Sequence, residues 1–127
     1  MIVFSLSSYA FADAKTVIFN TDFMLKTGES VQIERGLGLI TFIKIVEDSR
    51  CPTNVTCVWA GNVKTEFEIL DRDRKKTRIY LNSAIKPNKI LLKGYSLQIT
   101  SIFPSKIKGS EISEKKYQVK LRVEPAT

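Results

Sequence analysis

Hydrophobic and polar residues alternate with a period of two along most of this chain. The clearest case is the segment 117–123, where Tyr117, Val119, Leu121 and Val123 are separated by single polar residues. Alternation of this kind is typical of a β-strand with one buried face. No window longer than about ten residues keeps the spacing of three and four residues that a surface helix requires. The pattern therefore predicts an all-β protein.

Further segments with the pattern of a strand follow one another at short intervals. They are residues 16–20, 30–35, 39–46, 62–70, 77–82 and 95–100. The run 39–46 is apolar at both parities except for Thr41 and Lys44, so we expect a central strand that is covered on both faces. The alternation slips after Thr100, which indicates a β-bulge, and Pro104 should end the pairing. Seven or eight short strands predict a single antiparallel β-sandwich or Greek-key barrel.

Four connections between these segments have recognisable features. Residues 26–29 contain glycine and are typical of a turn, and the charged residues 71–76 are typical of a hairpin tip. The segment 86–89 contains proline and asparagine, and we expect it to cross between two sheets. Residues 110–116 are predicted to form one helical turn.

The composition restricts the chemistry of the protein. With 127 residues, 43% of them hydrophobic, the chain has material for one core and no second domain. It contains no histidine, which removes histidine-dependent triads and the commonest zinc ligands. Glu66 and Glu68 share one strand face and resemble a glycosidase pair, but this spacing is routine on a polar face. We therefore expect a protein that is not an enzyme, with no catalytic residues, metal or cofactor.

The first twelve residues have the features of a targeting segment. They carry no charge and end in the small-x-small sequence Ala10-Phe11-Ala12, as before a signal-peptidase site. A positive leading region is missing, which favours a translation start further upstream; a buried N-terminal strand is the alternative. We expect residues 1–12 to be a partial signal peptide and residues 13–127 to be a single domain. The protein should then be exported, periplasmic or extracellular, without a transmembrane segment.

The two cysteines agree with export. Cys51 and Cys57 are separated by five residues, and so close a pair in an exported chain most simply forms a local disulfide. Closing such a short loop should contribute about 2 kcal/mol to stability. A redox site usually has two residues between its cysteines, and a metal site needs more ligands than this chain offers.

The segment around the two cysteines is the densest cluster of unusual residue types in the chain. A loop closed by a disulfide loses little entropy on binding, so we interpret it as a recognition loop for a protein partner. The residues assigned to this surface are Asp48, Arg50, Thr53, Asn54, Val55 and Trp59. The competing interpretation is structural. In that interpretation Trp59 fills the core, and Asp48 pairs with Arg50 or caps nearby amides.

The same segment resembles a sequence signature. Residues 48–61 read D-S-R-C-P-x-x-V-x-C-V-W-A-G, which is similar to a segment of a group of small exported bacterial proteins of uncharacterised function. The later strands at 95–99 and 117–121 also resemble the closing strands of that group. The resemblance implies export, a small β-domain and two cysteines held close together, and it carries over no catalytic or binding residue. Members are often predicted lipoproteins, and this chain departs from them because it has no cysteine at the end of the leader.

Charge is distributed unevenly. Residues 13–71 hold six basic and nine acidic residues, whereas residues 72–127 hold fourteen and four, so the second part carries a net charge of plus ten. The densest basic cluster consists of Arg72, Arg74, Lys75, Lys76 and Arg78. It is extended, if the loops converge, by Lys86, Lys89, Lys93, Lys106 and Lys108. Such a face would attract anionic lipid or glycan, while the few aromatic residues nearby argue against nucleic acid. Solvated lysines that protect strand edges from aggregation are the alternative explanation.

Overall fold

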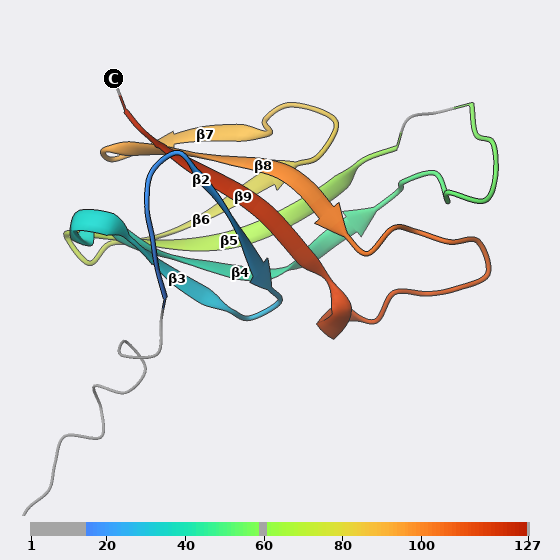
Figure 1. Cartoon of the computed structure of the whole chain (residues 1–127), viewed down its shortest axis with the longest axis horizontal. Helices are drawn as coiled ribbons and strands as arrows, with labels where there is room; N and C mark the ends of the chain where they lie inside the picture. Colours follow the sequence, from blue (N-terminus) through green and yellow to red (C-terminus); the bar gives the residue numbers. More distant parts are fainter. Residues whose placement is uncertain (1–14, 59–60, 127) are drawn as a thin grey trace, which may run out of the picture.

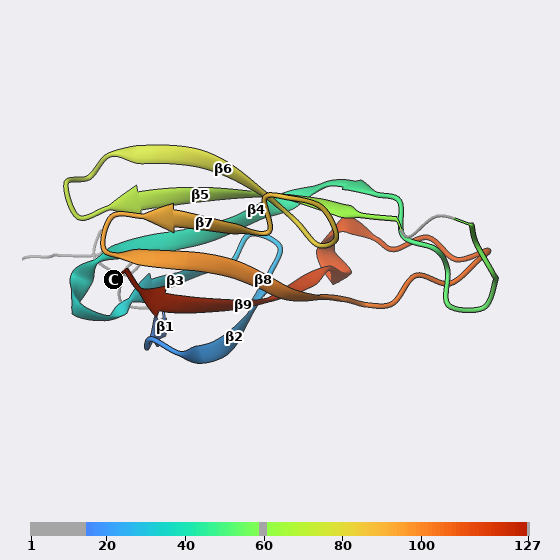
Figure 2. The same ribbon diagram turned by 90° about the horizontal axis from the view of Figure 1, so that it is seen from above.

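Two β-sheets pack against each other in the computed structural model, which describes residues 15–58 and 61–126 (Figure 1, Figure 2). The first sheet has five strands, in the order β1 (Lys15–Val17), β3 (Ser30–Ile33), β4 (Gly38–Asp48), β5 (Val63–Asp71) and β6 (Lys76–Asn82). The second has four strands, in the order β2 (Thr21–Lys26), β9 (Gln118–Pro125), β8 (Tyr95–Phe103) and β7 (Lys89–Leu92). The predicted all-β sandwich is confirmed.

All neighbouring strands are antiparallel except β1 and β3, which are parallel. The described part of the chain begins in the first sheet with β1, enters the second sheet for β2 and returns to the first for the meander from β3 to β6. It then crosses again through residues 83–88 and completes the second sheet with β7, β8 and β9. The predicted crossing around residues 86–89 is therefore confirmed, as is the charged hairpin between β5 and β6.

The core lies between the two sheets and is built by the alternation seen in the sequence. On β9, for example, Val119, Leu121 and Val123 point inward and are fully buried. Facing positions on both sheets supply the rest of the buried apolar cluster, which comprises Leu25, Val31, Ile33, Ile40, Phe42, Phe67, Ile69, Ile79, Leu81, Tyr95, Leu97, Ile99 and Tyr117. Burial of these side chains is the main contribution to the stability of the sandwich.

Strand β4 is central in its sheet, but its apolar run has a different cause from the one expected. The pairing with β5 shifts between Phe42 and Lys44 and again between Ile45 and Glu47. Each β-bulge adds one residue and so reverses which parity faces the core. Apolar residues that face the core consequently occur at both parities, Ile40 and Phe42 before the first bulge and Ile45 after it, whereas the outward Val46 is exposed. The expectation of a strand covered on both faces is wrong.

Two bulges on β4 also determine the direction of its last residue. Asp48 pairs with Val63, which is fully buried, and directly opposed residues of an antiparallel pair point to the same face. A charged residue is thereby directed inward at one end of the sandwich. On β8 the bulge predicted after Thr100 is present as a register shift between Ile99 and Ser101, and the strand ends at Phe103, before Pro104.

The region before residue 30 differs from the prediction. Instead of one strand at 16–20, the chain forms the short β1, a turn at Asn20 with a φ of 63°, and then β2. The turn is held by the Asn20 amide, which donates to the carbonyl of Val123 over 2.7 Å. Strand β2 was missed because Met24 interrupts the alternation of Phe23 and Leu25. Strand β7 was not expected from the alternation either, so the described residues contain nine strands, more than the seven or eight expected.

Helical structure in the described ranges consists of two short 3-10 helices, Glu34–Gly36 and Glu114–Lys116. The second lies within the segment predicted to form a helical turn. None of the helices in residues 15–58 and 61–126 has the length and apolar character needed to cross a bilayer. The expected signal peptide at residues 1–12 lies outside the described residues.

Candidate functional site

Two long loops extend beyond the sheets at one end of the sandwich (Figure 1, right; Figure 2, right). The first consists of residues 49–58 and 61–62, between β4 and β5, and contains the disulfide between Cys51 and Cys57. The second consists of residues 104–113, between β8 and the helix Glu114–Lys116. We call these segments the loop pair. The predicted disulfide is therefore present, and the loop that it closes lies beside a second loop.

Hydrogen bonds fasten the two loops to each other. The Thr53 amide donates to the carbonyl of Lys106 over 2.8 Å, and the Lys106 carbonyl also accepts from the Thr53 hydroxyl over 3.4 Å. The Lys108 amide donates to Oδ1 of Asn54 over 2.9 Å. Two residues that the sequence assigned to partner binding, Thr53 and Asn54, therefore hold the loop in place.

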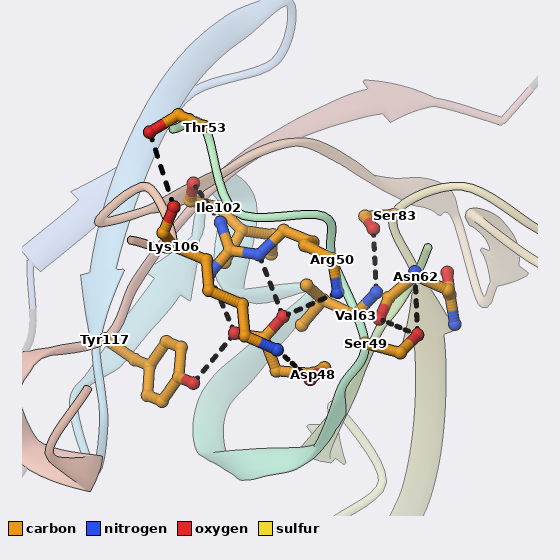
Figure 3. Close-up of polar contacts among 10 residues, drawn as sticks. All are labelled: Asp48, Ser49, Arg50, Thr53, Asn62, Val63, Ser83, Ile102, Lys106 and Tyr117. Atoms are coloured by element: carbon orange, nitrogen blue, oxygen red, sulfur yellow. Dashed lines mark hydrogen bonds and ion pairs between the residues drawn. The ribbon is translucent and has the colours of Figure 1, made fainter. Parts of the chain in front are cut away.

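Asp48 forms the base of the loop pair (Figure 3). Arg50 donates to both oxygens of the Asp48 carboxylate, from Nε to Oδ1 over 2.9 Å and from Nη2 to Oδ2 over 2.8 Å. The phenol of Tyr117 donates to Oδ2 over 2.9 Å. The side chain of Asp48 is 9% exposed and that of Arg50 is 18% exposed. This two-pronged geometry is the strongest form of an arginine–carboxylate contact.

The surroundings of these three side chains determine their charge. Burial raises the pKa of the Asp48 carboxyl, but hydrogen bonds from Arg50 and Tyr117 outweigh burial and leave this pKa below its usual value. The hydrogen bond to Asp48 raises the pKa of Arg50. The pKa of Tyr117 is raised to about 12, mainly by burial and secondly by its hydrogen bond to the Asp48 carboxylate. At neutral pH the site therefore contains an ion pair and a neutral phenol that donates to it.

The base also connects the loop pair to β8. Arg50 Nη1 donates to the carbonyl of Ile102 over 3.4 Å, and Lys106 Nζ donates to the carbonyl of Asp48 over 3.0 Å. Lys106 thus contributes its backbone to a contact between the two loops and its ammonium group to a contact with the end of β4 (Figure 3). The polar contacts of Asp48, Arg50 and Lys106 join the end of β4, the end of β8 and both loops.

The neck of the first loop is closed by contacts between its two ends. The Ser49 amide donates to the carbonyl of Asn62 over 2.8 Å, and the Asn62 amide donates to Ser49 Oγ over 3.0 Å. Gly61 has a φ of 77°, and a Cβ there would lie 2.5 Å from the Ser49 carbonyl oxygen. Only glycine fits this position without displacing the opposite strand of the neck. The side chain of Asn62 extends the contacts by accepting from the Ala84 amide over 2.9 Å.

Apolar side chains are exposed on the outside of the loop pair. Val58 is 99% exposed beside the disulfide, and Ile107 on the second loop is 50% exposed. The sequence did not assign Val58, Ile107 or Tyr117 to this surface and placed Lys106 in the basic face, because local spacing does not show which distant parts of the chain lie together. Val55 is half-buried. Trp59, which the sequence placed in the binding surface, lies outside the described residues.

The predicted basic face is divided in the structure. Arg72, Arg74, Lys75 and Lys76 are exposed on the hairpin at the end of the sandwich opposite the loop pair (Figure 1). Lys106 and Lys108 belong to the loop pair and do not join them. Other members of the predicted face are neutralised by ion pairs, which join Arg78 to Glu66 and Glu68, Lys89 to Glu124, and Lys93 to Asp71 and Asp73.

Comparison of this chain with protein-family models, with curated proteins and with solved structures finds no match.

Proposed function

We propose that this protein is an exported, non-catalytic module that binds another protein through the loop pair. The observation that carries the proposal is the exposure of Val58 and Ile107 on loops that are fixed by a disulfide, an ion pair and several hydrogen bonds. Exposed apolar side chains on a preorganised surface are suited to binding because little conformational entropy is lost. The disulfide suits an oxidising compartment, and the resemblance to a group of small exported proteins supports export.

The residues of the site take two different roles in this proposal. Asp48 and Arg50 lie at the base and maintain the shape of the loops. Thr53 and Asn54 are exposed, but their hydrogen bonds to the second loop make their main contribution structural as well. The contact surface itself is formed by Val58 and Ile107. Substitutions at these two positions should therefore remove binding without unfolding the protein.

A crosslinking pull-down from native envelope and medium tests the proposal. The wild-type protein should capture a defined partner, and Val58→Asp combined with Ile107→Asp should lose it. Ile18→Asp is the matched control, because Ile18 is 56% exposed and lies between β1 and β2, outside the loop pair. All variants should keep the wild-type melting temperature. Equal capture by the wild type and the double variant would contradict the proposal.

A second candidate function is binding to an anionic lipid or glycan through the tip of the hairpin between β5 and β6. The observation in its favour is that Arg72, Arg74, Lys75 and Lys76 form no ion pair with any residue of the described part of the chain. Four solvated cations on one turn attract polyanions, with an affinity that falls as salt rises.

Retention on heparin and on anionic vesicles tests the second candidate. Reversal of three charges by Arg74→Glu, Lys75→Glu and Lys76→Glu should abolish retention at low salt. Reversal of Lys108, Lys115 and Lys116 changes the net charge equally, but at or near the loop pair, and should leave most retention in place. Equal losses for the two triple variants would mean that retention depends only on net charge.

A further inference from the structure

One side of the sandwich carries two strand edges. Strand β6 is the last strand of the first sheet, and β7 is the last strand of the second, so among the described residues each has a neighbouring strand on one side only. Strand β7 is short, at four residues, whereas β6 has seven. The two edge strands follow each other in sequence and face the same side of the molecule (Figure 2). A free edge with an apolar groove beside it is the arrangement that accepts an added strand.

The hydrogen bonds at the end of β6 show which of its amides point outward. The Asn82 amide donates to the carbonyl of Pro87, away from β5, whereas the Ser83 amide donates to the carbonyl of Val63 at the end of β5. Successive residues of a strand alternate in this direction, and the register between β5 and β6 is continuous. Arg78 and Tyr80 therefore direct their N–H and C=O groups outward, where no described residue pairs with them.

Two cavities lie along this edge between β6 and β7. One has a volume of about 560 Å³ and includes Ile79, Ile85, Pro87 and Ile90 in its lining. The other has a volume of about 380 Å³ and includes Thr77, Leu91 and Leu92. An added strand would direct alternate side chains toward the core side of the sheet, where Ile79, Ile90 and Leu92 line these cavities. The larger cavity extends around the edge to the outer face, where Lys64, Arg78 and Tyr80 line it. The groove is therefore suited to a segment with apolar residues at every second position.

The charge around the groove favours an acidic occupant over a second copy of this chain. Lys75, Lys76 and Lys86 form no ion pair within the described ranges; Lys75 and Lys76 lie at the start of β6, and Lys86 lies on the loop that follows the strand. Pairing β6 with its own copy would collect the unpaired lysines of both copies at one interface, which is unfavourable. An acidic segment would instead meet complementary charge.

We propose that the open edge of β6 is a strand-addition site for an extended acidic polypeptide segment with alternating apolar residues. Backbone hydrogen bonds to Arg78 and Tyr80 supply the pairing, the two cavities accept the apolar side chains, and the lysines select the acidic ones. This site is separate from the loop pair, so the outcome for one does not decide the outcome for the other.

Binding of a synthetic peptide tests this site. The probe is a fluorescein-labelled octapeptide of alternating valine and glutamate, measured by fluorescence anisotropy, with a valine–lysine peptide as the charge control. The acidic peptide should bind at least ~tenfold more tightly than the basic one, equivalent to ~1.4 kcal/mol. Failure of the acidic peptide to bind at millimolar concentration, or equal binding of both peptides, would overturn the proposal.

A pair of substitutions at one position separates the backbone from the side chain. Tyr80→Pro removes the outward N–H that does not pair with β5, a change that edge strands accommodate, and it should weaken binding about tenfold. Tyr80→Thr keeps the N–H and should bind within about twofold of the wild type, since one backbone donor is retained. Binding by Tyr80→Pro as tight as wild type would overturn the proposal.

Amide chemical shifts of the wild-type protein give a readout that needs no variant. Addition of the acidic peptide should shift the amide resonances of Arg78 and Tyr80 most strongly, while those of the opposite edge strand β2 stay in place. Sedimentation in the presence of peptide should show one protein copy per complex. Unchanged Arg78 and Tyr80 resonances, or a peptide-free dimer that Tyr80→Pro disrupts, would assign the edge to another role and reject this one.

Discussion

Each end of the sandwich buries a tyrosine at the start of a strand of the second sheet, but the hydrogen bonding of the two hydroxyl groups differs. Tyr117 directly precedes β9 at the loop-pair end, and its phenol donates to Asp48. Tyr95 begins β8 at the hairpin end, is 1% exposed, and its phenol finds no hydrogen-bond partner among the described residues. The pKa of each phenol is raised to about 12, and burial is the main cause in both cases.

The difference in hydrogen bonding follows from the different connections that the two ends carry. The loop-pair end carries two long loops, which are held by polar contacts between distant parts of the chain. The hairpin end carries a short turn that is held locally, since Oδ1 of Asp71 accepts from the amides of Asp73 and Lys75 over 2.8 Å and 2.9 Å. A buried polar network is therefore needed at one end only. Substitutions at the loop-pair end should consequently have larger effects on stability.

Loss of the Asp48 carboxylate should have the largest effect. Asp48→Ala would leave the guanidinium of Arg50 buried without its counterion and Tyr117 without an acceptor, which should lower the free energy of unfolding by about 3 kcal/mol. Urea unfolding at pH 7 measures this change. Asp73→Ala at the exposed hairpin is the matched control and should leave the midpoint nearly unchanged. A comparable loss in both variants would remove the proposed difference between the two ends.

Low pH should reduce the contribution of the Asp48 carboxylate to the stability of the protein. The pKa of Asp48 in the folded protein lies below its usual value, so its contribution is complete above the unfolded pKa of about 3.9 and is lost as the pH falls through the folded value. The difference in stability between wild type and Asp48→Ala should therefore be constant from pH 7 to about pH 5 and shrink below about pH 4. A difference that stays constant down to pH 2 would show that the carboxylate charge is unimportant.

Removal of the disulfide should have the next largest effect. Replacing Cys51 and Cys57 by serine releases a short loop in the unfolded chain and should reduce the free energy of unfolding by about 2 kcal/mol. The sandwich should remain folded, while the amides of Thr53 and Lys108 should exchange with deuterium faster because the loop pair loosens. Unchanged exchange at these amides would mean that the hydrogen bonds alone hold the loops.

Removal of the Tyr117 hydroxyl should reduce the free energy of unfolding less than removal of the disulfide. Tyr117→Phe keeps the ring in the core but deletes one donor to a charged acceptor, which should reduce the free energy of unfolding by about 1.5 kcal/mol. Arg50 still neutralises Asp48 in this variant, so the loss should be about half of that in Asp48→Ala. Tyr80→Phe, at an exposed tyrosine, is the control and should unfold like the wild type.

The sequence predicts the inward direction of both buried tyrosines but not the difference between them. Alternation along β9 and β8 is regular where Tyr117 and Tyr95 lie, so their burial follows from period alone. The partner of Tyr117 cannot be predicted from the sequence, because Asp48 faces inward only after two bulges in β4, and the apolar run there predicts a strand covered on both faces. The contacts between the two loops cannot be predicted from local spacing either, because they join residues that are far apart in the sequence.

The smallest effect, and the one of opposite sign, is expected at the hairpin end. Tyr95→Phe removes a buried hydroxyl that pairs with no described residue and should leave the free energy of unfolding unchanged or raise it by up to about 1 kcal/mol. Gly38 lies close to this hydroxyl, since a Cβ at that position would be 3.2 Å from the Tyr95 oxygen. Parallel urea unfolding of Tyr95→Phe and Tyr117→Phe measures the comparison directly. A loss at Tyr95 as large as that at Tyr117 would mean that its phenol also forms a stabilising contact, and the two ends would then be held by the same principle.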